Sequence, residues 1–449
     1  MLHEERTSRR LAMSLRPGHT KLEELQGKLY AKAKAEPAFR FYALYDKIHR
    51  WDVLEEAFTK SKSKKGAAGV DGQTFEEIKE HGEERWLREL QHELQAKTYR
   101  PRAVKRVLIP KPGGGERPLG IPTIKDRVAQ TAAKLILEPI FEADLREEAH
   151  GYRPGRGAWQ AVEQVHRALK DGKTEVVDAD LSKYFDTIPH AELMTSVARR
   201  IADGAVLHLI KMWLKVPVQE EGEAGGPRLI GGKGSKQGTP QGGVISPLLA
   251  NIYINRLLKK FAGSDLGEKH GAVIVNYADD FVVLARWGAP LVLAKVKGWL
   301  IGMKLTLNEE KTCIRDGRKE HFRFLGYELG PVMHTKIGKT YLGARPSKQA
   351  LERAKGRVGE ILWRGRNERW EVIKTELNQF LRGWANYFRY DSPWKAFGQL
   401  DTQVQNRARN FLRRRHKQPT GTAQFGYREV HGKFGVLSVK GLLRAKAFA

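Results

Sequence analysis

The sequence is poor in cysteine, since Cys313 is the only one among 449 residues. A single thiol excludes a disulfide framework within the chain and a zinc site built from several cysteines, and it is typical of a reducing compartment. No apolar run approaches the ~20 residues that span a bilayer, and the first residues lack the apolar stretch of a secretory signal. We therefore expect a soluble, cytoplasmic protein with no membrane partner.

Acidic residues are also scarce relative to basic ones. The chain has 80 Lys and Arg against 52 Asp and Glu, a net charge of +28. A surplus of this size favours a polyanionic partner such as nucleic acid, although a solvated basic surface without a partner is the alternative. The surplus is uneven, because residues 345–449 hold 23 Lys and Arg against 8 Asp and Glu. This distribution predicts a basic C-terminal element.

Apolar periodicity divides the chain into helical ends and a mixed middle. Helical spacing runs through residues 22–60 and again beyond Pro346. Strand patterns cover residues 104–110 and 176–181, and two apolar runs within residues 272–284 predict a β-hairpin. The tail from Gln418 is expected to be less regular. The predicted fold class is therefore α+β, with helical appendages on a core of strands and helices.

Two groups of carboxylates stand where strands end or turn. Asp178 and Asp180 share one face of the predicted strand, and the adjacent Asp279 and Asp280 occupy the tip of the predicted hairpin. Nucleotidyl transfer uses two metal ions about 3.5–4 Å apart, held by a few carboxylates. Taken alone, Asp-Asp in a turn is ordinary turn chemistry. A separate strand that carries Asp178 and Asp180 favours a functional carboxylate site over that alternative.

These residues carry a family resemblance. Tyr277-Ala278-Asp279-Asp280 resembles the YxDD signature of reverse transcriptases, and Asp180–Asp186 resembles the segment with their first catalytic aspartate. Other blocks follow in the order of that family, at residues 109–122, 151–157, 238–247, 302–312 and 324–327. Residues 66–72 and 381–389 are similar to the extra N-terminal block and the thumb motif of group II intron-encoded reverse transcriptases, also called maturases. The resemblance runs from about residue 22 to about residue 416.

The resemblance implies a right-hand polymerase, with an antiparallel sheet in its fingers and palm. It places a helical N-terminal extension with the extra block at residues 1–98, and fingers and palm at 99–340. It then places a helical thumb, or maturase domain, at 341–392 and a small basic DNA-binding domain at 393–449. No Cys follows Cys313, and only His416 and His431 fall in the tail. We therefore expect no HNH-type endonuclease.

The resemblance also assigns roles to individual residues. Asp180, Asp279, Asp280 and the backbone carbonyl of Leu181 are expected to bind two Mg²⁺ ions. Phe185 is expected to act as a steric gate against a 2′-hydroxyl. The full nucleotide-binding set is Lys111, Arg117, Phe185, Gln241 and Lys311. The residues expected to bind RNA or DNA are Arg40, Arg153, Arg382, Arg389, Arg413, Arg414 and Arg415.

The function that follows is RNA-directed DNA synthesis, in which a primer 3′-hydroxyl attacks the α-phosphate of a deoxynucleoside triphosphate. A maturase also assists splicing, so the expected partners are a group II intron RNA, an RNA template with a DNA primer, and target DNA. Without an endonuclease, mobility would need a primer that the protein does not cut. The alternatives are a host-recruited reverse transcriptase in defence or repair, an RNA-binding splicing factor with little polymerase activity, and an RNA-dependent RNA polymerase.

Overall fold

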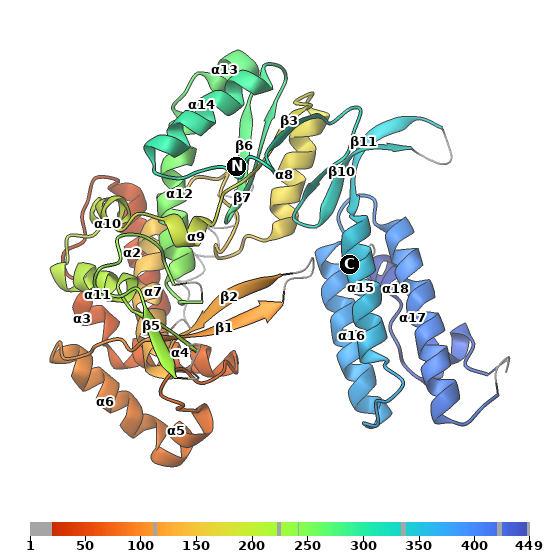
Figure 1. Cartoon of the computed structure of the whole chain (residues 1–449), viewed down its shortest axis with the longest axis horizontal. Coiled ribbons are helices and arrows are strands. Elements are labelled where there is room, and N and C mark those ends of the chain that lie inside the picture. Colours follow the sequence, from red (N-terminus) through yellow and green to blue (C-terminus); the bar gives the residue numbers. More distant parts are fainter. Residues whose placement is uncertain are drawn as a thin grey trace.

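A computed structural model describes residues 20–110, 115–221, 226–240, 242–333, 338–419 and 424–446. The described chain forms two masses, which the strands within residues 322–346 connect (Figure 1). One mass contains the N-terminal helices and two of the three sheets, and the other is a helical bundle near the C-terminus. Within the described residues, no helix is long and apolar enough to cross a membrane.

The N-terminal helices pack around one central helix. Thr20 and Thr74 close capping boxes with Glu23 and Glu77, which fix where two of the helices begin. The central helix, α7, is buried along most of its length, and α2 and α4 pack directly against it. The elements are α2 (Lys21–Ala35), α3 (Tyr45–Ile48), α4 (Trp51–Ser63), α5 (Phe75–His81), α6 (Glu83–Gln95) and α7 (Ile124–Glu142). The predicted helices within residues 22–60 are confirmed.

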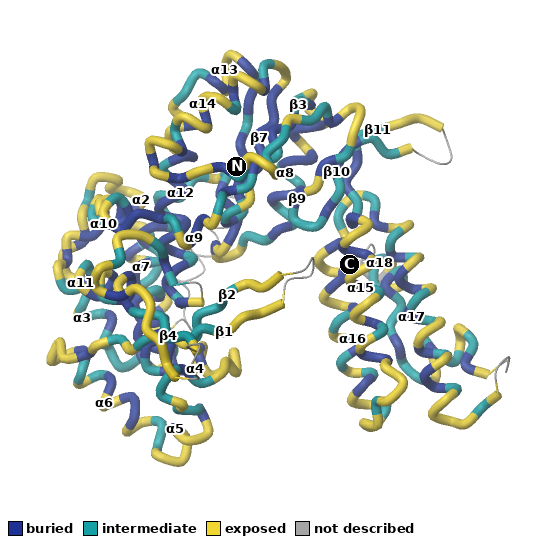
Figure 2. The backbone as a smooth tube through the Cα atoms, in the orientation of Figure 1, coloured by how far each residue is buried: buried dark blue, intermediate teal, exposed yellow. Residues whose placement is uncertain are grey.

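The fingers are a four-stranded sheet in the order β2-β1-β4-β5. Strand β1 (Val104–Pro110) has the predicted bounds and pairs antiparallel with β2 (Glu116–Ile121). Strand β4 (Val218–Glu221) joins β1 in parallel, and β5 (Pro227–Ile230) closes the edge. The β1–β2 hairpin extends into solvent, as its mostly exposed colouring shows (Figure 2).

The palm is a second four-stranded sheet, in the order β6-β7-β3-β8. Its strands are β3 (Glu175–Asp180), β6 (Val273–Tyr277), β7 (Asp280–Ala285) and β8 (Cys313–Asp316). The predicted hairpin is therefore confirmed as β6–β7. The surrounding helices are α8 (Ala158–Lys170), α9 (Tyr184–Thr187), α10 (His190–Ala198), α11 (Gly204–Leu214), α12 (Ser246–Ala262), α13 (Leu266–His270) and α14 (Ala289–Gly302).

Alternation along the palm strands divides the sheet between two cores. Val177, Ala179 and Phe281 point into the core shared with the N-terminal helices and α12. Val176 and Val282 point into a second core, which α8 and the thumb helices share. Since Asp178 and Asp180 alternate with the first group, they lie on the face that looks toward the second core.

A three-stranded sheet leads from the palm into the thumb, in the order β11-β10-β9. Its strands are β9 (Phe322–Phe324), β10 (Tyr327–Met333) and β11 (Thr340–Pro346). The thumb follows as α15 (Lys348–Ile361), α16 (Trp370–Tyr387) and α17 (Trp394–Arg415), then a π-helix (Glu429–Lys433) and α18 (Val439–Lys446). The prediction of a helical region beyond Pro346 is confirmed.

The C-terminal segment shares the core of the thumb. Phe397, Val404, Val430 and Val439 are buried in the same core as α15 and α16, so no gap in packing separates residues beyond 393 from the thumb. Asp401 fixes the start of α18 by accepting hydrogen bonds from the backbone of Val439 and Lys440. The described part of the tail beyond Gln418 has the short π-helix and α18 between irregular segments, which confirms the prediction of a less regular tail.

Candidate active site

The register of the palm sheet brings two of the predicted aspartates together. Asp180, the last residue of β3, pairs directly with Asp280, the first residue of β7. Cross-strand partners in an antiparallel sheet project from the same face, with Cα atoms roughly 4.5–5.5 Å apart. Asp279 precedes Asp280 in the connection between β6 and β7. The three predicted catalytic carboxylates therefore belong to one end of the sheet.

The connection that carries Asp279 is a two-residue turn under steric constraint. Tyr277 pairs with Asp280, so only Ala278 and Asp279 lie between the strands. Ala278 has a φ of +60°, a left-handed conformation that residues other than glycine rarely adopt. Gly151 approaches this turn so closely that a Cβ atom on it would lie 2.5 Å from the Ala278 nitrogen. The turn is therefore held by its surroundings as well as by its own strands.

Negative charge is concentrated around these carboxylates. Asp280 stays exposed as a residue, yet desolvation by the surrounding protein and repulsion from Asp279 and Asp180 raise its pKa to about 7. Burial and the charge of Asp180 likewise raise the pKa of Asp178 to about 6, against the lowering effect of Arg315. The Lys311 Nζ lies 2.9 Å from Asp180 Oδ2 and is the cation that meets this cluster. A site so charged favours additional cations.

The donor set fits Mg²⁺ bound together with a substrate. Among the described residues, no three Asp, Glu, His or Cys side chains converge closely enough to enclose a metal ion by themselves. Mg²⁺ does not need such a cage, because it keeps several waters and is usually bound by one or two carboxylates plus substrate phosphates. Asp180, Asp279 and Asp280 supply hard oxygen donors of that kind. The backbone carbonyl predicted as a ligand belongs to Leu181, the next residue, whose side chain is buried in the core shared with the N-terminal helices.

The strand end that carries Asp180 is fixed by a neighbouring loop. The backbone N–H of Asn308 donates to the Asp180 carbonyl at 2.8 Å, and that of Ser182 donates to the Thr306 carbonyl at 2.9 Å. The same loop leads to Lys311, which explains why this lysine reaches Asp180. Lys311 was predicted to bind nucleotide, and the structure places its ammonium group against Asp180; its role with nucleotide remains a prediction.

Phe185 lies beneath an aromatic residue that sequence reasoning missed. Its ring is buried and makes an edge contact with the half-exposed Tyr152, with centroids 6.3 Å apart. Burial and the charge of Asp279 raise the pKa of Tyr152, whereas Arg117 lowers it. Tyr152 is therefore within electrostatic reach of both the catalytic turn and the fingers. Its position in the block at residues 151–157 was the available signal.

The remaining nucleotide-binding predictions concern the fingers and the loop beneath them. Arg117 lies on β2, exposed and paired in register with Ile109. Lys111 and Gln241 lie outside the described residues. Next to Gln241, Gly242 has a φ of +107° and approaches Gly120 so closely that a Cβ would lie 2.0 Å from its carbonyl oxygen. This contact brings the loop at 238–243 against strand β2.

One predicted nucleic-acid contact is wrong for a clear physical reason. Arg153 is only 7% exposed and forms an ion pair of 2.6 Å with Glu142. Its guanidinium also donates to the carbonyls of Arg146 and Ala149. With its donors used inside the protein, Arg153 is a buried structural cation that stabilises the segment before the catalytic turn.

The other predicted nucleic-acid contacts lie at the surface. Arg382 and Arg389 are exposed on or just after α16, and Arg414 and Arg415 are exposed at the end of α17, where Arg413 is half-buried. Arg415 also donates to the Glu368 carbonyl at 2.7 Å. Arg40 is exposed, with its Nε donating to the Ala198 carbonyl at 3.0 Å. These six remain predictions.

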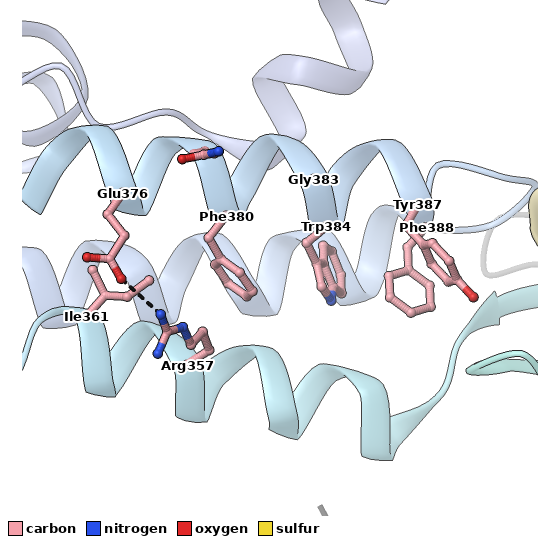
Figure 3. A pocket seen from close by; sticks show the side chains of 9 residues that line it. Arg357, Ile361, Glu376, Phe380, Gly383, Trp384, Tyr387 and Phe388 are labelled. Carbon is pink, nitrogen blue, oxygen red and sulfur yellow. Dashed lines mark hydrogen bonds and ion pairs between the residues drawn. The ribbon is translucent and has the colours of Figure 1, made fainter. Parts of the chain in front are cut away.

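The thumb carries an aromatic groove of about 560 Å³ along α16. Phe380, Trp384 and Phe388 line it at helical spacing, and an ion pair of 2.9 Å between Arg357 and Glu376 lies near one end (Figure 3). At the other end, Tyr387 donates to the Leu325 carbonyl. Burial and the charges of Tyr277 and Asp280 raise the pKa of Tyr387 to about 12, so this end lies close to the catalytic turn.

The fold and the paired aspartates define a right-hand nucleotidyltransferase with palm, fingers and thumb. Comparison with known proteins gives the same class. Residues 109–329 match the family described as reverse transcriptase (RNA-dependent DNA polymerase), and residues 351–429 match the group II intron, maturase-specific domain. The second match crosses residue 393, in agreement with the continuous packing of the thumb.

Individual relatives agree. The chain is 34% identical over 350 residues to Protein YkfC of Escherichia coli (strain K12), covering 69% of this chain and 88% of that protein. It is also 34% identical over 353 residues to the group II intron-encoded protein LtrA of Lactococcus lactis subsp. cremoris, covering 64% of this chain and 57% of LtrA. A solved telomerase from Candida albicans is similar at a TM-score of 0.41 and 14% identity, covering 70% of this chain and 59% of that chain.

The chain therefore belongs to the group II intron-encoded reverse transcriptases, or maturases. It contains the polymerase domain of an RNA-directed DNA polymerase and the maturase domain that follows it in this family. The telomerase similarity is too weak to add to this assignment, which rests on the family matches and the palm geometry.

Proposed function

We propose that the chain copies RNA into DNA at the Asp180–Asp279–Asp280 site, with two Mg²⁺ ions as its cofactors. The observation that carries the proposal is the register pairing of Asp180 with Asp280 beside the Asp279 turn. Divalent ions bound there would stabilise charge on the attacking and leaving oxygens. The substrates would be an RNA template, a DNA primer and deoxynucleoside triphosphates.

The chain's own residues would orient these substrates. Arg117 offers a forked donor for the triphosphate, and Lys311 offers a point charge beside Asp180. Phe185 would lie under the incoming sugar, with Tyr152 in edge contact with its ring. A bulky ring at that place would exclude a 2′-hydroxyl, which favours DNA over RNA synthesis.

The test is deoxynucleotide incorporation on a primed RNA template with Mg²⁺. Asp279→Asn keeps the shape of the side chain and removes the charge, so we expect it to abolish incorporation. Asp171→Asn is the matched control, because Asp171 is an exposed carboxylate outside the site. Incorporation by Asp279→Asn at the wild-type rate would contradict the proposed site.

We also propose that the thumb gives the chain a splicing role on a group II intron RNA. The maturase-specific match and the basic residues on α16 and α17 support it. Target DNA would bind the same basic region. Splicing of the adjacent intron RNA should survive in Asp279→Asn, whereas charge removal at Arg382 and Arg389 should weaken it. Loss of both activities in Asp279→Asn would contradict this separation.

The proposed place of action is a cytoplasmic ribonucleoprotein. The single cysteine, which fits a reducing compartment, supports it. A host-recruited role in defence or repair is distinguished by the genome, because a mobile-element protein should lie within an intron ribozyme sequence.

A further inference from the structure

Ala278 in the catalytic turn has a left-handed backbone conformation that depends on the groups around it. Ala278 is buried, and its φ of +60° is unfavourable for a residue with a Cβ atom. A turn in an unfavourable conformation persists only when its surroundings over-determine it. Because Asp279 and Asp280 follow directly, the groups that hold Ala278 also set where these two carboxylates lie.

One buried amide holds the backbone on both sides of Asp279. The Asn276 Nδ2 donates to the Ala278 carbonyl at 2.9 Å and lies 3.3 Å from the Asp280 carbonyl, which it also bonds. Only a donor is stable between two carbonyl oxygens, so the orientation of the amide is fixed by chemistry. We infer that Asn276 is a positioning residue, which sets the geometry of the catalytic turn through these two hydrogen bonds.

The other end of the same amide supports this role. Asn276 is 1% exposed, and its Oδ1 has no hydrogen-bond partner among the described residues. Burying an unpaired acceptor is unfavourable, and an apolar side chain of similar volume would avoid it. The two hydrogen bonds that Asn276 donates to the turn offset this disadvantage. The role of Asn276 is therefore to hold the turn, and not to add to the general stability of the palm.

The backbone of Asn276 connects the turn to a second anchor. Its N–H donates to the Glu148 carbonyl at 2.8 Å, and its carbonyl accepts from the His150 N–H at 2.9 Å. Gly151, the residue after His150, lies in close contact with Ala278. The Gly151 carbonyl accepts a hydrogen bond from Asn251 Nδ2 on α12 at 2.8 Å. The turn is thus clamped between the Asn276 side chain and a segment that α12 holds in place.

This inference rests on the proposed function, since it concerns the carboxylates assigned to catalysis. If the bonds are lost, the turn can relax and displace Asp279 and Asp280. A displacement of about 1 Å at reacting groups lowers the rate on the order of 100-fold. The binding of template and primer should not change, because the clamp lies beneath the turn rather than at the surface.

The test compares two asparagines in the full chain. Asn276→Leu removes both bonds to the turn and keeps the branched shape of the side chain. Asn378→Leu is the matched control: the half-buried Asn378 amide also makes two backbone bonds, to Gly435 and Leu437 in the thumb, away from the turn and its clamp. The measurements are kcat, the KM for deoxynucleotide, the Kd for primed template, the melting temperature, and hydrogen exchange of residues 277–281.

We expect Asn276→Leu to lower kcat roughly 10- to 100-fold with an unchanged Kd for primed template, and to speed exchange at 277–281. Asn378→Leu should lower the melting temperature, with kcat within about threefold of wild type. Equal losses of kcat in both variants, or unchanged exchange at the turn in Asn276→Leu, would overturn the inference. If wild type itself incorporates no nucleotide, the proposed function fails, while hydrogen exchange still decides whether Asn276 holds the turn.

Discussion

The two hairpins that carry proposed site residues, one in the palm and one in the fingers, differ in how they are supported. In the catalytic hairpin β6–β7, Phe281, Val282 and Val283 are almost fully buried between two cores. In the fingers hairpin β1–β2, Leu108 is 53% and Ile109 is 43% exposed. The residues that would hold metal ions are thus built on a rigid base, and Arg117 is carried on an exposed ribbon. Metal ligands need fixed geometry, whereas a group that grips a triphosphate can rely on the substrate to complete its contacts.

Because the palm sheet is buried and holds the proposed metal ligands, we expect a substitution there to cause the largest loss of activity. Asp180→Asn removes a proposed metal ligand and the ion pair with Lys311. We expect the rate of single-nucleotide incorporation to fall about 10³-fold, a loss similar to that of a main electrostatic group in other active sites. Rapid-quench kinetics with saturating Mg²⁺ would measure it. A loss smaller than tenfold would show that Asp180 is not a ligand.

Glycine substitutions test the two hairpins against each other. An alanine at position 151 would place Cβ 2.5 Å from the Ala278 nitrogen, so the catalytic turn must move. We expect kcat to fall roughly 10- to 100-fold. Gly115 lies in the fingers hairpin with a φ of +77° and open space around it, so Gly115→Ala strains only its own backbone and should keep kcat within about threefold. A similar loss of kcat in both variants would remove the distinction.

Arg117 should show a different kinetic signature from the palm residues. Arg117→Ala removes a forked donor from the exposed ribbon, and we expect the KM for deoxynucleotide to rise about tenfold with a smaller change in kcat. Arg117→Lys keeps the charge without the fork and should lie between the two. Steady-state kinetics with varied deoxynucleotide would measure this. An unchanged KM in Arg117→Ala would place the triphosphate elsewhere.

The sequence was informative where one local pattern determines the structure. Strand β1 has the predicted bounds because apolar residues and a following glycine run leave few alternatives. The catalytic hairpin was also predictable, since two apolar runs flank the short Ala278-Asp279 turn. The family resemblance then identified Asp180 as the partner of Asp280, a pairing across about 100 residues that no local pattern contains.

Predictions failed where tertiary packing decides. Arg153 belongs to a motif that suggests nucleic-acid contact, but it forms a buried ion pair with Glu142, eleven residues earlier on α7. The composition of the tail beyond Gln418 did not show which of its side chains complete the thumb core, namely Phe425, Val430, Val436 and Val439. Asn276 showed no signal of its own, because its role depends on carbonyls that only the folded turn presents. A residue's type indicates what it can bind, and the fold determines which partner reaches it first.

The smallest effect that we predict concerns the acid crowding of the palm in the absence of metal. The folded-state pKa of Asp178 is raised to about 6, so its ionisation is less favourable in the folded chain than in the unfolded one. Stability that depends on this carboxyl is intact below its unfolded pKa, near 4, and is lost as pH rises toward 6 and above.

Asp178→Asn removes the charge, and it should therefore stabilise the metal-free protein at pH 8 by about 1 kcal/mol, after allowance for solvent screening, and leave it nearly unchanged at pH 4. Melting temperatures of wild type and variant across this range would measure the difference. If Asp178→Asn instead destabilises the chain at pH 8, the attraction of Asp178 to Arg315 outweighs its burial and its repulsion from Asp180. The carboxylates on this face of the palm would then be balanced without an added cation.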